Sequence, residues 1–132
     1  MESCPILRRR QHMRSQKGTL SNLKKSAHGI ESYDSLLERD YMIELEHDPA
    51  VREWTKRHQI VIPYRLFGFP RRYHPDFLVT YKDGSQELHE TKGLPLMFWL
   101  STQIKRQSAE EHCAFKGWKY KLVTRGIRWS RI

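Results

Sequence analysis

The chain has 132 residues, which is enough for one hydrophobic core and too few for two. Its 24 Lys and Arg exceed its 15 Asp and Glu, and the resulting net charge of +9 favours a polyanionic partner. Two cysteines are too few for a disulfide framework or for a zinc site of the usual spacing, which predicts a reducing, cytoplasmic location. No apolar run approaches the roughly 20 residues of a membrane span, so no membrane association is expected.

Composition divides the chain into three parts. Residues 1–29 are predicted to form a basic, largely irregular arm. Residues 30–125 have the apolar patterns of a folded domain, and residues 126–132 form a basic tail. Both ends are candidate DNA contacts, since cations that neutralise phosphates release counterions; a solvated arm and an ordinary edge segment are the alternatives. The candidate contacts near the ends are Arg8, Arg9, Arg10, Arg125 and Arg128.

A helix is predicted over residues 32–46. Ser32 or Ser35 can cap its start, and Pro49 lies just beyond its end. Glu38 lies one residue from the apolar stripe and can reach the edge of the core, so it is a candidate site residue; an ordinary solvated helix acid is the alternative. The apolar stripe consists of Leu36, Leu37, Tyr41, Met42 and Leu45.

Two strands and a turn are predicted next. Val51 and Trp54 are the expected buried positions of a first strand over residues 51–56. A second strand over residues 59–66 is too apolar for an exposed edge, and the chain turns at residues 67–70.

A hairpin follows this turn. Arg71 and Arg72 are predicted to enter the strand that holds Asp76, where a scissile DNA strand would pass; an exposed edge is the alternative. Residues 77–81 continue this strand, and residues 82–85 form a turn with Asp-Gly at its centre.

Residues 86–92 form the returning strand. Because side chains alternate along a strand, Leu88, Glu90 and Lys92 share one face, and Glu87, His89 and Thr91 share the other. Antiparallel pairing therefore brings Glu90 and Lys92 close to Asp76.

Two carboxylates and a lysine in one place indicate a metal-dependent hydrolase. Asp76 and Glu90 would repel each other when partly buried, and a divalent cation relieves that cost. Hard oxygen ligands suit Mg²⁺, with Mn²⁺ as a substitute. Such an ion acidifies a bound water and neutralises charge on a phosphate, while Lys92 orients the water or stabilises the same charge. Phosphodiester hydrolysis is the reaction that fits.

The last predicted elements are a helix over residues 97–115, which Gly117 ends, and a strand over residues 118–123. This strand should run parallel to its neighbour because a helix separates the two. Lys105, early in the helix, is a candidate phosphate contact, although a solvent-facing position is the alternative.

Pro75-Asp76 followed after a turn by Glu90-x-Lys92 resembles the PD-(D/E)xK motif of restriction-endonuclease-like nucleases. The predicted order of helix, three strands, helix and strand resembles the core of that fold. The expected fold class is therefore α/β, with an α-β-β-β-α-β core in which helices flank a mixed central sheet.

Three longer stretches resemble the N-terminal catalytic domain of TnsA endonucleases. They are residues 33–40 (YDSLLERD), 48–51 (DPAV) and 72–79 (RYHPDFLV), and the similarity covers residues 30–125. That family nicks the 5′ ends of heteromeric bacterial transposons while a partner transposase acts on the 3′ ends. The resemblance therefore implies DNA, a transposase subunit and a transposition regulator as partners.

The resemblance also implies roles for site residues. Glu38 would be the helix acid of the site and a further candidate ligand, Asp76 and Glu90 the metal ligands, and Lys92 the catalytic lysine. The Thr91 main-chain carbonyl would complete the metal shell. TnsA proteins usually carry a further C-terminal domain that binds the regulator, and 132 residues leave no room for one, which weakens the expected transposition role but not the chemistry.

Other functions stay open at this point. Tailed-phage head-completion nucleases share a similar core, including the V-x-x-W and I-P-Y patterns at residues 51–54 and 62–64, and phage structural proteins would then be the partners. A stand-alone DNA-processing or junction nuclease, an RNA-directed nuclease and a catalytically silent DNA-binding or assembly module are further alternatives. Convergent acids repel DNA, which argues against the silent module. A double-strand cut would require two active sites, hence a homodimer or a partner nuclease.

Overall fold

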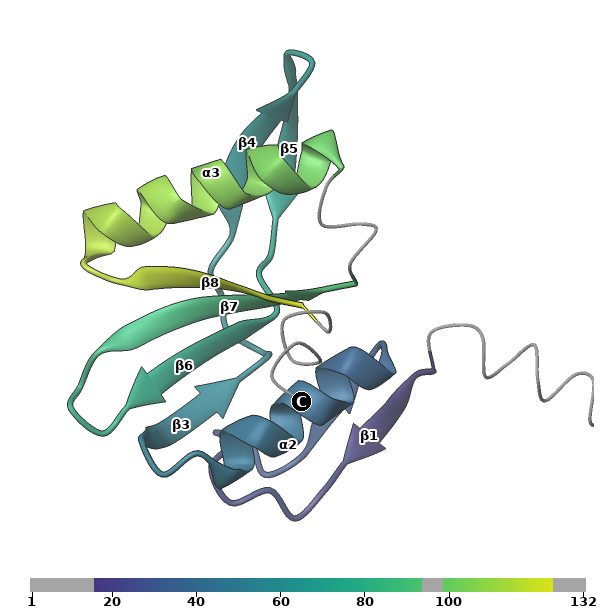
Figure 1. The fold of residues 1–132 in the computed structure, drawn as a ribbon, viewed down its shortest axis with the longest axis vertical. Coiled ribbons are helices and arrows are strands. Elements are labelled where there is room, and N and C mark those ends of the chain that lie inside the picture. The colour runs from purple at the N-terminus through teal and green to yellow at the C-terminus, as the bar shows by residue number, and fades with distance from the viewer. Residues whose placement is uncertain (1–15, 94–98, 125–132) are drawn as a thin grey trace, which may run out of the picture.

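The computed structural model describes residues 16–93 and 99–124 (Figure 1). Two helices and eight strands follow each other along this part of the chain. They are β1 (Gly18–Leu20), β2 (Glu31–Tyr33), α2 (Leu36–His47), β3 (Val51–Thr55), β4 (Ile62–Leu66), β5 (Phe69–Tyr73), β6 (Phe77–Tyr81), β7 (Gln86–Lys92), α3 (Leu100–Lys116) and β8 (Lys119–Thr124).

A four-stranded sheet in the order β3-β6-β7-β8 forms the centre of the molecule. Its first three strands are antiparallel, with Phe77 opposite His89 in the β6–β7 pair, and β8 runs parallel to β7. The parallel pair follows from the α3 crossover between them. The predicted mixed sheet and the α-β-β-β-α-β order are confirmed, with α2, β3, β6, β7, α3 and β8 as the core elements.

The α2 helix covers one face of the sheet. Tyr41, Met42 and Leu45 of this helix pack against a cluster of buried sheet residues: Val51, Trp54, Phe77 and Val79. The Tyr41 hydroxyl also lies 2.6 Å from His89 Nδ1, which joins α2 to β7 directly. The predicted buried positions Val51 and Trp54 are thus confirmed.

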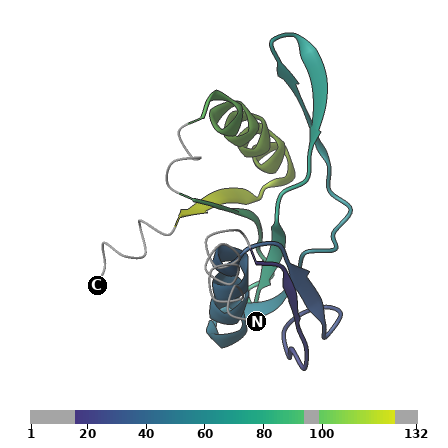
Figure 2. The ribbon, with the colours of Figure 1, turned by 90° about the vertical axis from the view of Figure 1, so that its right-hand side faces the viewer.

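The α3 helix covers the opposite face, so the sheet lies between two helices (Figures 1 and 2). Ala109 and Cys113 of α3 pack with Leu88 of β7. Strands β4 and β5 pair with each other in a separate hairpin, and its base packs on α3 through Ile62, Tyr64 and Tyr73.

The helix predicted over residues 32–46 begins later, at Leu36. Residues 31–33 instead form β2, which pairs with β1. Ser35 is extended, with φ −153° and ψ 161°, and its side chain accepts a hydrogen bond from the Glu38 N–H, so it caps the helix. Strand β1, Gly18–Leu20, lies within residues 1–29, the arm that is predicted to be largely irregular.

The second predicted strand was placed wrongly. It begins at Ile62 rather than residue 59, and it belongs to the β4–β5 hairpin rather than to the central sheet. Arg71 and Arg72 lie in β5 of that hairpin, not in the strand that Asp76 opens. The reason is a two-residue turn at Phe67 and Gly68, with φ values of 52° and 83°, which folds β5 back onto β4.

The remaining elements lie close to their predicted bounds. Strand β7 occupies residues 86–92 as expected, and α3 ends at Gly117, which adopts a left-handed conformation with φ 76°. The start predicted for this helix, at residue 97, lies outside the described residues. In the described part of the chain, no helix has the length and apolar character needed to cross a membrane.

Candidate active site

Asp76 and Glu90 lie side by side at the ends of adjacent strands. The Asp76 N–H donates to Glu90 Oε1 at 3.0 Å. In return, Thr91 donates to Asp76 Oδ2 twice, from its N–H at 2.9 Å and from its hydroxyl at 2.7 Å. The backbone of each strand thus holds the carboxylate of the other, and the charge of Asp76 acts on Glu90.

Burial makes both acids harder to ionise. Desolvation raises the pKa of Glu90 to about 8, and the charge of Asp76 is the next largest cause. Desolvation also raises the pKa of Asp76, and the Glu38 carboxylate adds to this effect, while the hydrogen bonds from Thr91 oppose it. The two groups therefore form a half-buried acidic pair that favours a nearby positive charge.

Lys92 follows Glu90 by two residues on the same strand, and it is half-buried. Its charge lowers the pKa of Glu90, so the structure brings the two together electrostatically, as the alternation predicts. Thr91 takes part in the site through its N–H and hydroxyl. The metal-binding role of its carbonyl stays a prediction.

Glu38 is buried at the start of α2 and already has partners. Its Oε1 accepts a hydrogen bond from the Asp34 N–H at 2.9 Å and an ion pair from Lys56 Nζ at 2.6 Å. The solvated-acid alternative is wrong, since the residue is only 8% exposed. Glu38 lies near enough to Asp76 to raise its pKa, but it reaches the site with one oxygen engaged by a lysine.

Lys56 is a site residue that sequence reasoning missed. Its ammonium group also donates to the Ser32 carbonyl at 2.9 Å, and its charge lowers the pKa of Asp76. The available signal was strand alternation, because Lys56 lies two positions after buried Trp54 and so shares its inward face. It was overlooked because a lysine at a strand end is usually solvated.

Two tyrosines border the site on the α3 side of the sheet. The Tyr73 and Tyr120 hydroxyls lie 2.8 Å apart, and Tyr73 also hydrogen-bonds Glu90, which lowers the pKa of that acid. Tyr73 ends β5 and Tyr120 lies in β8, so the pair joins the hairpin to the central sheet next to a candidate ligand.

The predicted DNA contacts are spread over different elements. Arg71 and Arg72 are exposed on β5. Lys105 lies on α3, where its Nζ is 5.9 Å from the Tyr64 ring centroid and 5.6 Å from that of Tyr73. The other candidates, Arg8, Arg9, Arg10, Arg125 and Arg128, lie outside the described residues.

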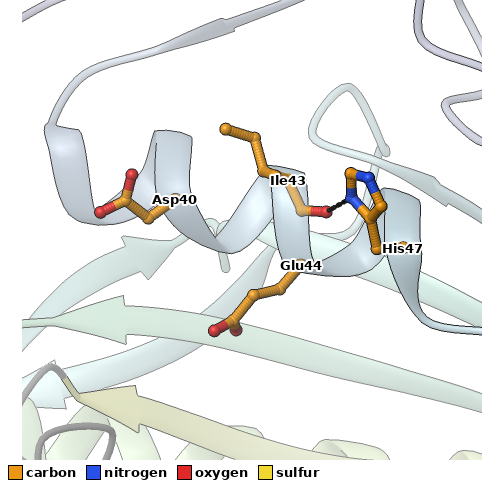
Figure 3. A pocket seen from close by; sticks show the side chains of 4 residues that line it. All are labelled: Asp40, Ile43, Glu44 and His47. Carbon is orange, nitrogen blue, oxygen red and sulfur yellow. Dashed lines mark hydrogen bonds between the residues drawn. The ribbon is translucent and has the colours of Figure 1, made fainter.

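Among residues 16–93 and 99–124, no group of three or more His, Cys, Asp and Glu side chains is arranged to hold a metal ion. The candidate site supplies two carboxylates, with the third, Glu38, paired to Lys56. A separate surface hollow on α2 is lined by Asp40, Ile43, Glu44 and His47, and His47 Nδ1 lies 2.9 Å from the Ile43 carbonyl oxygen (Figure 3). It includes none of the predicted site residues.

A mixed sheet between two helices defines the restriction-endonuclease-like fold class. The model of the TnsA-like endonuclease N-terminal domain matches residues 48–125, and the chain belongs to that family. The matched range includes Asp76, Glu90 and Lys92 and begins after α2, so Glu38 lies outside it. A comparison with curated proteins found no match. Nucleases of this class act on DNA.

Proposed function

We propose that this protein is a Mg²⁺-dependent endodeoxyribonuclease whose site consists of Asp76, Glu90, Lys92 and Glu38. One observation carries the proposal: the reciprocal hydrogen bonds by which the chain at each acid binds the carboxylate of the other, at the neighbouring ends of β6 and β7. A structural role alone does not account for this arrangement, because two half-buried acids side by side destabilise the fold unless a cation or a proton compensates them.

The donor set supports Mg²⁺, with Mn²⁺ as a substitute. Thr91 occupies Asp76 Oδ2 and the Asp76 N–H occupies Glu90 Oε1, so we assign Asp76 Oδ1 and Glu90 Oε2 to the ion. Two carboxylates are the number that Mg²⁺ usually takes from a protein, since it keeps waters and substrate phosphate oxygens as its other ligands. We also propose the Thr91 carbonyl as a ligand. When bound, the ion acidifies a water ligand and neutralises charge on the phosphate.

The protein's own groups position the reactants. Lys92, on the same strand face as Glu90, orients the attacking water or stabilises negative charge on the phosphate. Glu38 acts indirectly. Lys56 binds its Oε1, and the charges of Glu38 and Lys56 both act on the Asp76 carboxylate. The half-buried setting strengthens each of these electrostatic contacts by excluding bulk water.

For the biological context we propose cleavage at the ends of a mobile DNA element in the cytoplasm, together with a transposase subunit and a transposition regulator. The family match supports this over the phage head-completion and junction-nuclease alternatives. Transposase and regulator genes next to the gene for this chain would favour the proposal, whereas virion assembly genes would contradict it.

Plasmid cleavage tests the chemistry. We expect the purified protein with Mg²⁺ or Mn²⁺ to convert supercoiled plasmid to the open-circular form, and we expect no conversion with EDTA. Asp76→Asn, Glu90→Gln and Lys92→Met should each abolish nicking, because each keeps the side chain's shape and removes its charge. Salt-sensitive DNA binding should remain in all three variants. Mn²⁺ titration calorimetry gives a second readout, with heat lost in the Asp76 and Glu90 variants.

Two control variants test whether nicking is lost because the site is changed or because the protein's charge is changed. Glu53→Gln removes an exposed acid on β3, and Lys119→Met removes an exposed lysine on β8; both should nick as the wild type does. Equal nicking by the wild type and the site variants would point to a contaminating nuclease and overturn the proposal. Cleavage of single-stranded RNA in preference to duplex DNA would overturn the substrate assignment.

A further inference from the structure

The β4–β5 hairpin extends past α3, away from the central sheet (Figures 1 and 2). Its base is fixed, because Ile62 and Tyr73 face each other across the two strands and are buried against α3. Exposure rises toward the tip, where the Phe67 and Phe69 side chains are 77% and 64% exposed. The hairpin is therefore a firmly held projection that ends in two aromatic rings.

The turn at the tip is costly for the folded chain alone. Phe67 has φ 52°, a left-handed conformation that bulky residues rarely adopt, and Asn or Asp is the usual residue at this place in a two-residue turn. The exposed ring recovers little burial energy in return for this strain. Strain at an exposed aromatic residue points to a role in binding.

The hairpin is also strongly basic. Arg65, Arg71 and Arg72 are exposed on its strands, and the sequence has no acid between Glu53 and Asp76. Residues opposite each other across the strands share a face. Pro63 pairs with Arg72 and Arg65 with Pro70, whereas Arg71 pairs with Tyr64, so arginines lie on both faces behind the aromatic tip. A polyanion with apolar rings of its own matches this surface, and DNA has both.

The hairpin is joined to the candidate active site by a short segment. Seven residue steps separate Phe69 from Asp76, which limits the distance between them to about 24 Å at about 3.4 Å per residue. This length corresponds to about seven base pairs of duplex at the same rise. Tyr73, at the base of β5, hydrogen-bonds Tyr120 and contacts Glu90 electrostatically. The tip therefore lies within a bounded distance of the acids.

We propose that the β4–β5 hairpin is a wedge that inserts Phe67 and Phe69 into a base step within about seven base pairs of the phosphate that is cut. The three arginines hold phosphates on either side of the inserted rings. Insertion costs less where stacking is already weak, so the preferred substrate is duplex DNA with a mismatched or easily deformed step near the cut. This inference rests on the proposed nuclease function and names its substrate class.

The test compares two duplexes of about 30 base pairs, one fully paired and one with a central mismatch flanked by 2-aminopurine. In the cleavage-deficient Asp76→Asn background, the protein should bind the mismatched duplex roughly tenfold more tightly and raise the 2-aminopurine fluorescence. The added change Phe67→Ala/Phe69→Ala should remove both the preference and the fluorescence rise. Phe115→Ala is the matched control, since that ring is 91% exposed on α3, and it should retain both.

The possible outcomes separate this inference from the proposed function. If the Phe67→Ala/Phe69→Ala protein melts at the unchanged temperature and keeps the mismatch preference, the wedge is wrong. If the Asp76→Asn protein binds both duplexes with equal affinity, the wedge is also wrong, but the nuclease proposal stands. If the wild type does not nick DNA, the nuclease proposal is wrong. Loss of a sedimenting dimer in the double variant, with DNA binding unchanged, would identify the tip as a self-association surface and overturn the proposal.

Discussion

Two single residues, Asp76 and Glu90, set the electrostatics of the candidate site. The backbone of each strand donates to the carboxylate of the other, so neither acid can move away from its neighbour without losing a hydrogen bond. Desolvation and mutual repulsion raise both pKa values. The metal-free site should therefore bind protons at a pH where ordinary carboxyl groups have lost theirs.

This gives a pH dependence of stability with a defined sign. The Glu90 pKa is about 8 in the folded protein against an ordinary value of 4.5, so folding binds a proton between these values. The contribution is complete below pH 4.5 and is lost as the pH rises through 8. In EDTA, the melting temperature of the wild type should fall from pH 6 to pH 9 by more than that of Glu90→Gln.

The Glu90→Gln variant is its own control, because the amide keeps an acceptor for the Asp76 N–H. Addition of Mg²⁺ at pH 8 should raise the melting temperature of the wild type and leave Glu90→Gln less affected, since ion binding stabilises the folded state. Parallel curves for the two proteins in EDTA would show that Glu90 ionises normally.

The Lys56 and Glu38 pair makes a second prediction for single residues. The two side chains are only 15% and 11% exposed, so removing the lysine leaves a largely buried charge. We expect Lys56→Met to lower the free energy of unfolding by roughly 3 kcal/mol in urea titrations. The double variant Lys56→Met/Glu38→Gln should recover much of the loss because neither charge is left alone. A loss below about 0.5 kcal/mol, typical of an exposed pair, would contradict this account.

Among the elements, α2 shows how a strand pairing selects between two local capping signals. Two serines can cap the helix by composition, and the structure uses Ser35, whose Oγ accepts from the Glu38 N–H at 3.1 Å. Ser32 is excluded because residues 31–33 pair with β1. The choice depended on a strand pairing that spans more than ten residues of chain, which periodicity does not reveal.

Ser35→Ala should lower the free energy of unfolding by about 1 kcal/mol, the usual value of a helix N-cap. Ser35→Asp should restore most of it, since a carboxylate also accepts from the N–H groups of the first turn and favours that end of the helix dipole. Ser21→Ala, at an exposed position outside the helices and strands, should change stability little. Urea unfolding of the three variants checks the order.

The β4–β5 hairpin was misassigned for a different reason. Phe67-Gly68 is not one of the Asn-Gly or Asp-Gly pairs that mark a two-residue turn, so the sequence predicts only a longer turn over residues 67–70. Ile62 is buried and Tyr64 half-buried, as a strand too apolar for an exposed edge predicts, but they pack with α3 rather than with another strand of the central sheet.

On the scale of the whole molecule, the site lies where the two layers meet. The α2 side contributes Glu38 and Lys56 to the charge around Asp76, and the α3 side contributes Tyr73 to the environment of Glu90. Asp76 directly precedes β6 and Glu90 lies in β7, the two inner strands of the sheet. Neither layer alone would enclose the pair enough to raise its pKa values.

Local sequence patterns are enough to predict the β6–β7 hairpin, its face alternation and the proximity of Asp76, Glu90 and Lys92. These features depend on contacts between residues close in the chain, where turn chemistry and the two-residue period of a strand leave one arrangement. Long-range packing, in contrast, sets three features: Lys56 pairs with Glu38, Tyr73 contacts Tyr120, and β4 and β5 leave the central sheet. Each of these joins segments distant along the chain, and no local pattern records which distant partner will satisfy a buried charge or an apolar face.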